Sequence, residues 1–274
     1  MDFSQLEKIA QRIRCHIVKM VAEAGSGHAG GSLSAVEIFI MLFFQEMNID
    51  PEQPRWQERD YFVLSKGHAT PVYYATLAER GFFPVEELMT FRKINSRLQG
   101  HPDRKSTPGV DMTTGSLGQG LSSANGMALA LKMDGHSQRR VFAILGDGEL
   151  QEGQIWEAAM TSAHYKLDNL TIFVDYNGLQ IDGVIYDIMS PAPIADKFRA
   201  FNWHVQEIDG HDFSQIARAI AEAQEEKGRP SAIIARTVKG KGVSYMENEA
   251  DWHGKAPDGD QLCQALTDLK GEAQ

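Results

Sequence analysis

The segment VFAILGDG (141–148) is an apolar run that ends in Gly146-Asp147-Gly148, and it predicts a buried strand followed by a tight turn into a helix. A second apolar run, LTIFVD (170–175), is followed closely by Asn177. If both strands belong to one parallel sheet, the side chains of Asp147 and Asn177 emerge at the same edge. Mg²⁺ prefers oxygen ligands and usually shares them with phosphate oxygens. The two segments therefore predict a site for a metal-bound diphosphate.

Strands and helices alternate along most of the chain, which favours a doubly wound α/β fold, a mostly parallel sheet with helices on both faces. The expected strands span 61–64, 141–145, 170–175, 203–208 and 231–236. The expected helices span 3–23, 34–47, 69–80, 121–133, 151–166, 212–227 and 258–274. Ser34 is expected to be the N-cap of the second helix. No linker marks a boundary, so residues 1–274 are expected to form a single domain.

Composition and charge argue against several classes of protein. A net charge of -10 over 274 residues argues against a nucleic-acid partner, because no basic face is available to displace counterions. Two cysteines make no disulfide framework. The first residues have neither a basic region nor a long apolar run, so secretion is not expected. The most apolar run, 38–44, is far shorter than the roughly 20 residues of a membrane span. We expect a cytoplasmic protein with no membrane partner.

Each half of the diphosphate motif has a plainer interpretation. Gly-Asp-Gly could be only a turn in which Asp147 caps the next helix, and Asn177-Gly178 could be only a tight turn. The distance between the two motifs in the sequence, and the strand expected before each, favour a single site that contains both. A dinucleotide-binding fingerprint does not fit, because Gln151 stands where its third glycine belongs.

His28, His68, His101 and His253 each adjoin glycine in expected loops. Any one of them could be an ordinary loop residue, and no spacing typical of a zinc site is present. As a set on loops at one sheet edge, they indicate a pocket lined by imidazoles. Imidazole suits proton transfer and hydrogen bonding to hydroxyl groups near neutral pH.

Five segments in this order resemble the N-terminal, diphosphate-binding part of a transketolase: SGHAGG (26–31), SKGHA (65–69), GHP (100–102), TGSLGQG (114–120) and GDGELQEG (146–153). The resemblance extends from about residue 5 to 255. It implies thiamine diphosphate as the cofactor, held with Mg²⁺ or with Ca²⁺ or Mn²⁺ in its place. The implied reaction moves a two-carbon ketol unit from a ketose phosphate to an aldose phosphate, as in the pentose phosphate pathway.

The resemblance also implies a set of site residues. The metal ligands are the side chains of Asp147 and Asn177 and the backbone carbonyl of Leu179. The implied cofactor-binding residues are His68, Gly115, Ser116, Leu117, Gly146, Asp147, Gly148, Glu149, Asn177 and His253. The implied catalytic residues are His28, His68, His101, His253 and Glu152. Among these, His28 and His101 would contact substrate hydroxyls, and Glu152 would be buried in a carboxylate network that links paired active sites.

A full-length transketolase continues into domains that have no counterpart in this sequence. The resemblance therefore implies the N-terminal subunit of a split enzyme, inactive or nearly so without a separate C-terminal subunit. Truncation of a longer protein is the alternative. By analogy with the full-length homodimer, two such pairs would form a heterotetramer.

Other interpretations of the same residues stay open. The substrate could be an unusual sugar, such as a sulfo-sugar or a branched pentose phosphate. A deoxyxylulose-phosphate synthase is possible, whereas a dehydrogenase E1 α-subunit lacks the SKGH and WHG loops seen here. A non-catalytic protein on the same fold would have no need for Asp147, Asn177 and four loop histidines together.

Overall fold

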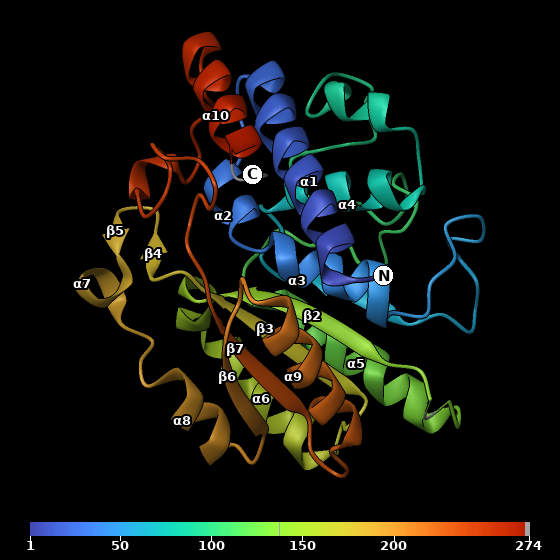
Figure 1. Cartoon of the computed structure of the whole chain (residues 1–274). Helices are drawn as coiled ribbons and strands as arrows, with labels where there is room; N and C mark the ends of the chain where they lie inside the picture. The colour runs from blue at the N-terminus through green and yellow to red at the C-terminus, as the bar shows by residue number, and fades with distance from the viewer. Residues whose placement is uncertain (137, 272–274) are drawn as a thin grey trace.

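A five-stranded parallel sheet forms the centre of the molecule, in the order β1-β2-β3-β7-β6 (Figure 1). The computed structural model describes residues 1–136 and 138–271. The strands are β1 (Tyr61–Leu64), β2 (Val141–Gly146), β3 (Leu170–Tyr176), β6 (His204–Asp209) and β7 (Ser231–Arg236). A separate antiparallel ribbon pairs β4 (Leu179–Gln180) with β5 (Gly183–Val184).

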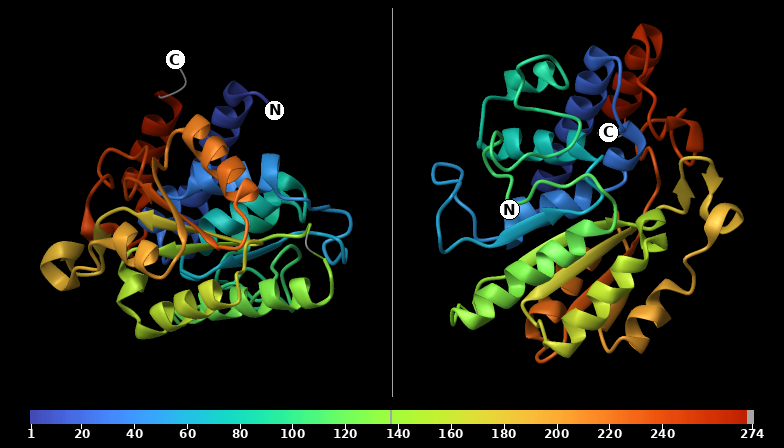
Figure 2. Two further views of the ribbon diagram at one scale, coloured as in Figure 1. Left: turned by 90° about the horizontal axis from the view of Figure 1, so that it is seen from below. Right: turned by 180° about the vertical axis from the view of Figure 1, so that it is seen from behind.

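Helices cover both faces of the sheet, which confirms the expected doubly wound fold (Figure 2). One side carries α1 (Phe3–Ala24), α2 (Ala29–Leu33), α3 (Val36–Met41), α4 (Thr70–Arg80), α9 (Phe213–Glu225) and α10 (Gly259–Gly271). The other carries α5 (Gln119–Met133), α6 (Gly153–His164) and α8 (Ile194–Ala200), and the short α7 (Ile185–Met189) follows β5. The remaining helical turns are η1 (Leu42–Glu46), η2 (Val85–Thr90), η3 (Gly148–Gln151) and η4 (Ala250–Trp252). Across residues 1–136 and 138–271, no helix has the length and apolar character needed to cross a membrane.

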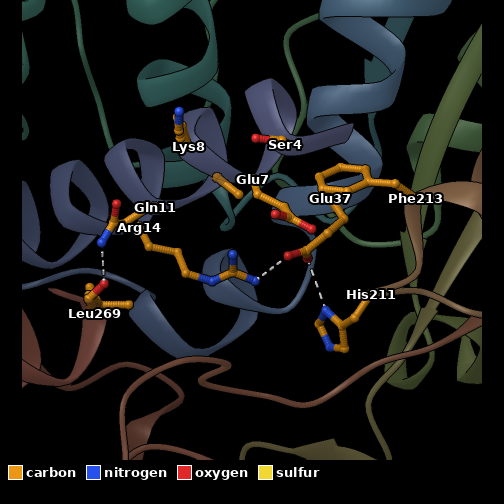
Figure 3. A pocket seen from close by; sticks show the side chains of 10 residues that line it. Ser4, Glu7, Lys8, Gln11, Arg14, Glu37, His211, Phe213 and Leu269 are labelled. Carbon is orange, nitrogen blue, oxygen red and sulfur yellow. Dashed lines mark hydrogen bonds and ion pairs between the residues drawn. The ribbon is translucent and has the colours of Figure 1, made fainter. Parts of the chain in front are cut away.

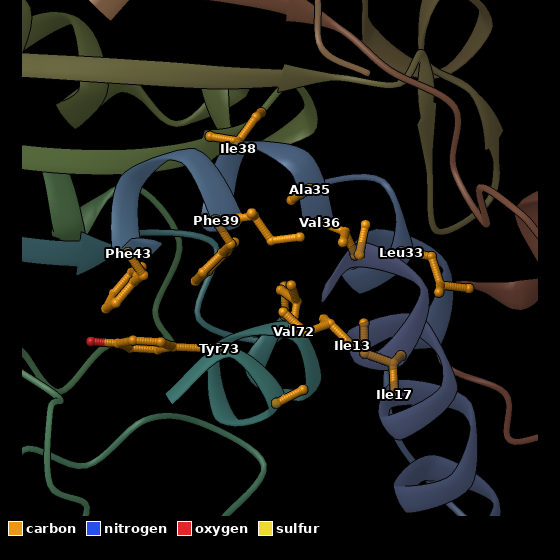
Figure 4. Packing of buried hydrophobic residues seen from close by; sticks show 14 of the residues in the cluster. Ile13, Ile17, Leu33, Ala35, Val36, Ile38, Phe39, Phe43, Val72 and Tyr73 are labelled. Carbon is orange, nitrogen blue, oxygen red and sulfur yellow. The ribbon is translucent and has the colours of Figure 1, made fainter. Parts of the chain in front are cut away.

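The central strands are continuous apolar runs because both of their faces are buried. In β2, Phe142 and Ile144 join the core beneath α1, α3 and α4, whereas Ala143 and Leu145 join the core beneath α5 and α6. The first core contains an aromatic group in which Phe39, Phe43 and Tyr73 pack together (Figure 4), with ring centroids 5.7 to 5.9 Å apart. This packing fixes α3 and α4 over the sheet.

The expected helix over 34–47 is wrong at its start. Helix α2 ends at Leu33, and α3 begins at Val36 with Ala35 as its N-cap. The hydroxyl of Ser34 instead donates to the carboxylate of Asp175, with Oγ 2.6 Å from Oδ2. Because Asp175 is fully buried, its carboxylate needs hydrogen-bond donors, and that need takes the serine away from a capping position.

The other expected elements are present, with ends that differ by one or two residues. The expected helix 151–166 begins later, because residues up to Gln151 form the tighter turn η3. The expected closing helix is α10, and residues 272–274 of that prediction lie outside the described residues. The strand ends that carry the predicted site residues all meet at one edge of the sheet.

Candidate active site

A cavity of about 420 Å³ lies at the carboxyl ends of the central strands. It is lined by His68 after β1, Asp147 after β2, Asn177 after β3 and Lys239 after β7. Ligands of doubly wound sheets bind at this edge, where the strand order reverses. The structure thus brings together residues that the sequence places up to about 170 positions apart.

Asp147 is almost fully buried at the end of β2. Its Oδ1 accepts a hydrogen bond from the amide of Gly148 at 2.8 Å, and its Oδ2 accepts one from the amide of Gly178 at 2.7 Å. Burial, followed by the nearby carboxylate of Asp175, raises the pKa of Asp147 to about 7. A cation bound beside this carboxyl group would favour its ionised form. The electrostatics of Asp147 therefore suit a metal ligand.

Asn177 follows β3, and Leu179 is the first residue of β4. The side-chain Oδ1 of Asn177 accepts a hydrogen bond from the Leu179 amide at 3.1 Å, which fixes the two residues relative to each other. With Asp147 they offer a carboxylate, an amide oxygen and a backbone carbonyl, all of the oxygen type that Mg²⁺ prefers. In the described part of the chain, no group of three or more His, Cys, Asp or Glu side chains could hold a metal. The predicted metal ligands do not form such a group, because Asp147 is the only His, Cys, Asp or Glu among them.

Two buried lysines also line the cavity, and sequence reasoning did not include either among the site residues. Lys66 is 2% exposed, is ion-paired with Asp175, and donates from Nζ to the carbonyl of Gly31 at 2.7 Å. Lys239 is 1% exposed, and its Nζ lies 3.0 Å from Nδ1 of His253. Burial lowers the pKa of Lys239 to about 8. Both lysines adjoin glycine just after a strand, in SKGH and KGKG, which is the signal that could have found them.

Three of the four predicted histidines form a compact group in the cavity. The ring centroids of His28, His68 and His253 lie 5.0 to 5.3 Å apart. Burial and then nearby cations lower the pKa of His28 to about 4 and that of His253 to about 3, and they hold the pKa of His68 well below its usual range. At neutral pH these imidazoles are uncharged, so they can donate and accept hydrogen bonds.

His101 lines the same cavity but is exposed. Its pKa is lowered first by burial of part of the ring and then by Arg92. The loop that contains Gly115 packs against it, since a Cβ at Gly115 would lie 3.0 Å from the imidazole ring of His101. Gly115 and Leu117 line the cavity, whereas Ser116 lies outside its lining and is exposed.

Glu149 and Glu152 lie in different environments in the single chain. In the single chain Glu152 is exposed at the N-cap of α6, so its expected burial between paired active sites stays a prediction. The turn η3 buries Glu149, and its carboxylate accepts hydrogen bonds from Ser65 Oγ and from the amides of Gly118 and Gly146. Glu149 therefore holds three loops of the site together.

Similarity to known proteins identifies the family of this chain. Residues 5–271 match the family model described as transketolase, thiamine diphosphate binding domain. The chain belongs to the transketolase family. The match covers every predicted site residue, and the five segments that resemble a transketolase all lie within it.

Relatives in this family include separate subunits of similar length. The chain is 46% identical to the 6-deoxy-6-sulfo-D-fructose transketolase subunit of a Clostridium species, over 97% of both chains. It is 43% identical to a subunit of the apulose-4-phosphate transketolase of Actinobacillus succinogenes, over 99% of this chain and 98% of that one. Human transketolase is also 43% identical, but the match covers 91% of this chain and only 40% of the human protein.

Solved transketolase structures share the fold described above. The transketolase of Campylobacter jejuni superposes with a TM-score of 0.92 and 32% identity, over 98% of this chain and 43% of that one. A transketolase of Pichia stipitis also gives a TM-score of 0.92 at 32% identity, over 96% of this chain and 40% of that one. This chain thus spans about two-fifths of the full-length enzymes and nearly all of the separate subunits.

Proposed function

We propose that this chain is the N-terminal subunit of a two-subunit transketolase. It would transfer a two-carbon ketol unit from a ketose phosphate to an aldose phosphate, with thiamine diphosphate and a divalent cation. The observation that carries the proposal is a single cavity that combines the oxygen ligands around Asp147, two buried lysines and a group of uncharged histidines.

The charged side of the cavity fits a metal diphosphate. Asp147, Asn177 and the carbonyl of Leu179 would hold the cation, which keeps further coordination positions for phosphate oxygens. Lys66 and Lys239 line the same space and would offset the remaining negative charge. Glu149 would act indirectly, because its hydrogen bonds fix Gly118 and Gly146 beside the diphosphate.

The histidine side of the cavity fits a polyhydroxylated substrate. Thiamine diphosphate, when bound, supplies the nucleophilic carbon and the electron sink for breaking and forming the carbon–carbon bond. His28, His68 and His253 would orient substrate hydroxyl groups and move protons at their ring nitrogens, because each is uncharged at neutral pH. His101, at the exposed side of the cavity, would contact the part of the sugar that extends toward solvent.

A partner subunit is supported by an exposed apolar segment beside the cavity. Ile181 lines the cavity and is 68% exposed, and the next turns expose Val184, Tyr186, Ile188 and Met189. Several exposed apolar side chains along one segment are typical of protein–protein contacts. We infer that a C-terminal subunit covers this segment and completes the active site. Two such pairs would form the heterotetramer, in which Glu152 could be covered by a second copy of this chain.

A sulfo-sugar transketolase subunit is the second candidate. It is favoured by the 46% identity to a subunit named for 6-deoxy-6-sulfo-D-fructose, over nearly the full length of both chains. The cavity described here belongs to the cofactor and to the hydroxyl groups near the reacting carbons. A phosphate and a sulfonate at the far end of the sugar would be distinguished by the partner.

The test is ketol transfer with purified chain, Mg²⁺ and thiamine diphosphate, with and without a C-terminal transketolase subunit from the neighbouring reading frame. Xylulose 5-phosphate with ribose 5-phosphate is the first donor and acceptor pair, and 6-deoxy-6-sulfo-D-fructose replaces the donor in a second arm. Activity only in the mixture supports the proposal, and the better donor selects between the two candidates. Failure of the mixture to bind thiamine diphosphate would reject both.

A further inference from the structure

A second cavity of about 440 Å³ lies between α1, α3, α10 and the turn after β6 (Figure 3). Three side chains from different elements meet at it: Arg14 of α1, Glu37 of α3 and His211 after β6. Oε1 of Glu37 accepts from Nη2 of Arg14 at 2.6 Å, and its Oε2 lies 2.9 Å from Nδ1 of His211. Arg14, Glu37 and His211 are called the Glu37 brace below.

The hydrogen bonds of His211 determine which of its ring nitrogens carries the proton. The backbone amide of Val238 points at Nε2 of His211, at 2.9 Å. An amide N–H can only donate, so Nε2 accepts and the proton of the neutral ring is on Nδ1. Nδ1 therefore donates to Glu37. His211 thus connects a buried carboxylate with the backbone of the loop after β7.

Arg14 contacts the same loop on the other side of Lys239. Its Nε donates to the carbonyl of Lys241 at 3.2 Å, while its Nη2 is bound to Glu37. The brace therefore fixes Val238 and Lys241, the residues that flank Lys239 and Gly240. The side chain of Lys239 enters the candidate active-site cavity and meets His253 there.

The Glu37 brace is expected to add little to the stability of the fold. Glu37 and Arg14 are 6% and 5% exposed. Burial alone would raise the pKa of Glu37, but Arg14 and the hydrogen bond from His211 outweigh it and lower the pKa, so Glu37 is ionised. Buried ion pairs stabilise folded proteins little compared with apolar side chains of similar size, because both charges must be desolvated. Their geometry points to a positioning role.

We propose that the Glu37 brace positions Lys239 in the active-site cavity and so strengthens diphosphate binding without contacting the cofactor. The inference rests on the proposed function, because Lys239 is taken to meet the diphosphate. Arg14, Glu37 and His211 are positioning residues in this view, and they act through the backbone of Val238 and Lys241.

Two substitutions of His211 separate positioning from packing. In His211→Asn, the side-chain amide can still donate to Glu37, but nothing reaches the place of Nε2 to accept from Val238. In His211→Gln, the longer side chain can accept from Val238. We expect His211→Asn to speed hydrogen exchange of the Val238 amide and to raise the Kd for thiamine diphosphate with Mg²⁺ about threefold to tenfold, the worth of one hydrogen bond. His211→Gln should stay closer to wild type in both measurements.

Ser162→Ala is the matched control for lost stability. It removes a buried hydrogen bond, from Ser162 Oγ to Asn125 Oδ1 at 2.6 Å, between α6 and α5. It should lower the Tm without changing Val238 exchange or cofactor affinity. Should either His211 variant fail to fold, Glu37→Gln serves in its place, because it keeps the shape but weakens both contacts. It should likewise speed Val238 exchange and raise the Kd.

The inference is overturned if His211→Asn and His211→Gln lose Tm equally and both keep the wild-type Kd and Val238 exchange. Faster exchange with an unchanged Kd would overturn the link from the brace to the diphosphate. If the wild-type chain mixed with the C-terminal subunit binds no thiamine diphosphate, the proposed function fails instead. The exchange measurement still shows whether the brace holds the loop.

Discussion

The two sides of the active-site cavity differ in how they carry charge. One side holds buried ionisable groups, chiefly Asp147, Lys66 and Lys239. The other side holds His28, His68 and His253, whose pKa values are all lowered. Burial is the larger cause, and the lysines of the first side add to it. The cations that suit a diphosphate therefore also help to keep the neighbouring imidazoles uncharged.

The two lysines differ from each other in the same way. Lys66 is paired with the fully buried Asp175, whereas Lys239 makes no salt bridge with any residue that the structure describes. Lys66 therefore neutralises a charge within the fold, whereas Lys239 is free to bind an anionic ligand. The following predictions test that division, beginning with the largest effect.

Lys66→Met should be the most disruptive change. It leaves Asp175 buried without its cation, and breaking a buried pair in this way costs about 3–5 kcal/mol. Urea unfolding of the chain without cofactor would measure the loss. The isosteric double variant Lys66→Met, Asp175→Asn should recover part of it, since no uncompensated charge is left. An unchanged unfolding free energy in the single variant would mean that Asp175 does not depend on Lys66.

Asp147→Ala should weaken the binding of thiamine diphosphate with Mg²⁺ by about 100-fold or more. Changing only a partner of a metal ligand typically costs 10- to 100-fold, so loss of the ligand itself should cost at least as much. Isothermal titration measures the affinity, and Asp196→Ala, an exposed aspartate of α8, is the control. Wild-type affinity in Asp147→Ala would remove Asp147 from the metal site.

Lys239→Met should weaken cofactor binding about tenfold, the worth of a charge-assisted hydrogen bond. Unlike Lys66→Met, it should leave the free energy of unfolding unchanged or higher, because it removes a buried charge that has no carboxylate partner among the described residues. Urea unfolding would measure the stability of each variant, and isothermal titration would measure its affinity for the cofactor. Loss of stability as large as in Lys66→Met would show that the two lysines do not divide their roles.

The smallest effect expected is a pH dependence from the histidine side. Because the pKa values of His28 and His253 are lowered to about 4 and about 3, the unfolded chain binds protons before the folded chain does as pH falls below about 6.5. Their contribution to stability is therefore complete above pH 6.5 and is lost as pH falls toward 4. The full shifts would cost about 4 kcal/mol between pH 7 and 5. Solvent around these partly exposed rings screens the charge, so the loss should be on the order of 1 kcal/mol.

His253→Gln should make this decline shallower in the chain without cofactor, because one of the two depressed groups is gone. Unfolding in urea at several pH values gives the slope. Identical slopes in wild type and His253→Gln would show that His253 is not held uncharged by the fold.

Local sequence patterns predicted much of the fold and of the site. Apolar runs predicted the five strands of the central sheet, and the glycine-rich turns after them predicted where Asp147, Asn177 and His68 stand. These signals are local because a strand buried on both faces must be apolar, and a tight turn at its end favours glycine. The positions of the site residues relative to the sheet therefore followed from the sequence.

The protonation states and the supporting contacts were decided only by the tertiary structure. Ser34 and Lys66 reach Asp175 across more than 100 residues, the turn η3 buries Glu149, and the Glu37 brace joins three separate elements. Burial and charge pairing are properties of the folded neighbourhood, so no spacing in the sequence encodes them. The sequence by itself determined which residues stand at the strand ends, and the tertiary structure decided their charges and what holds them in place.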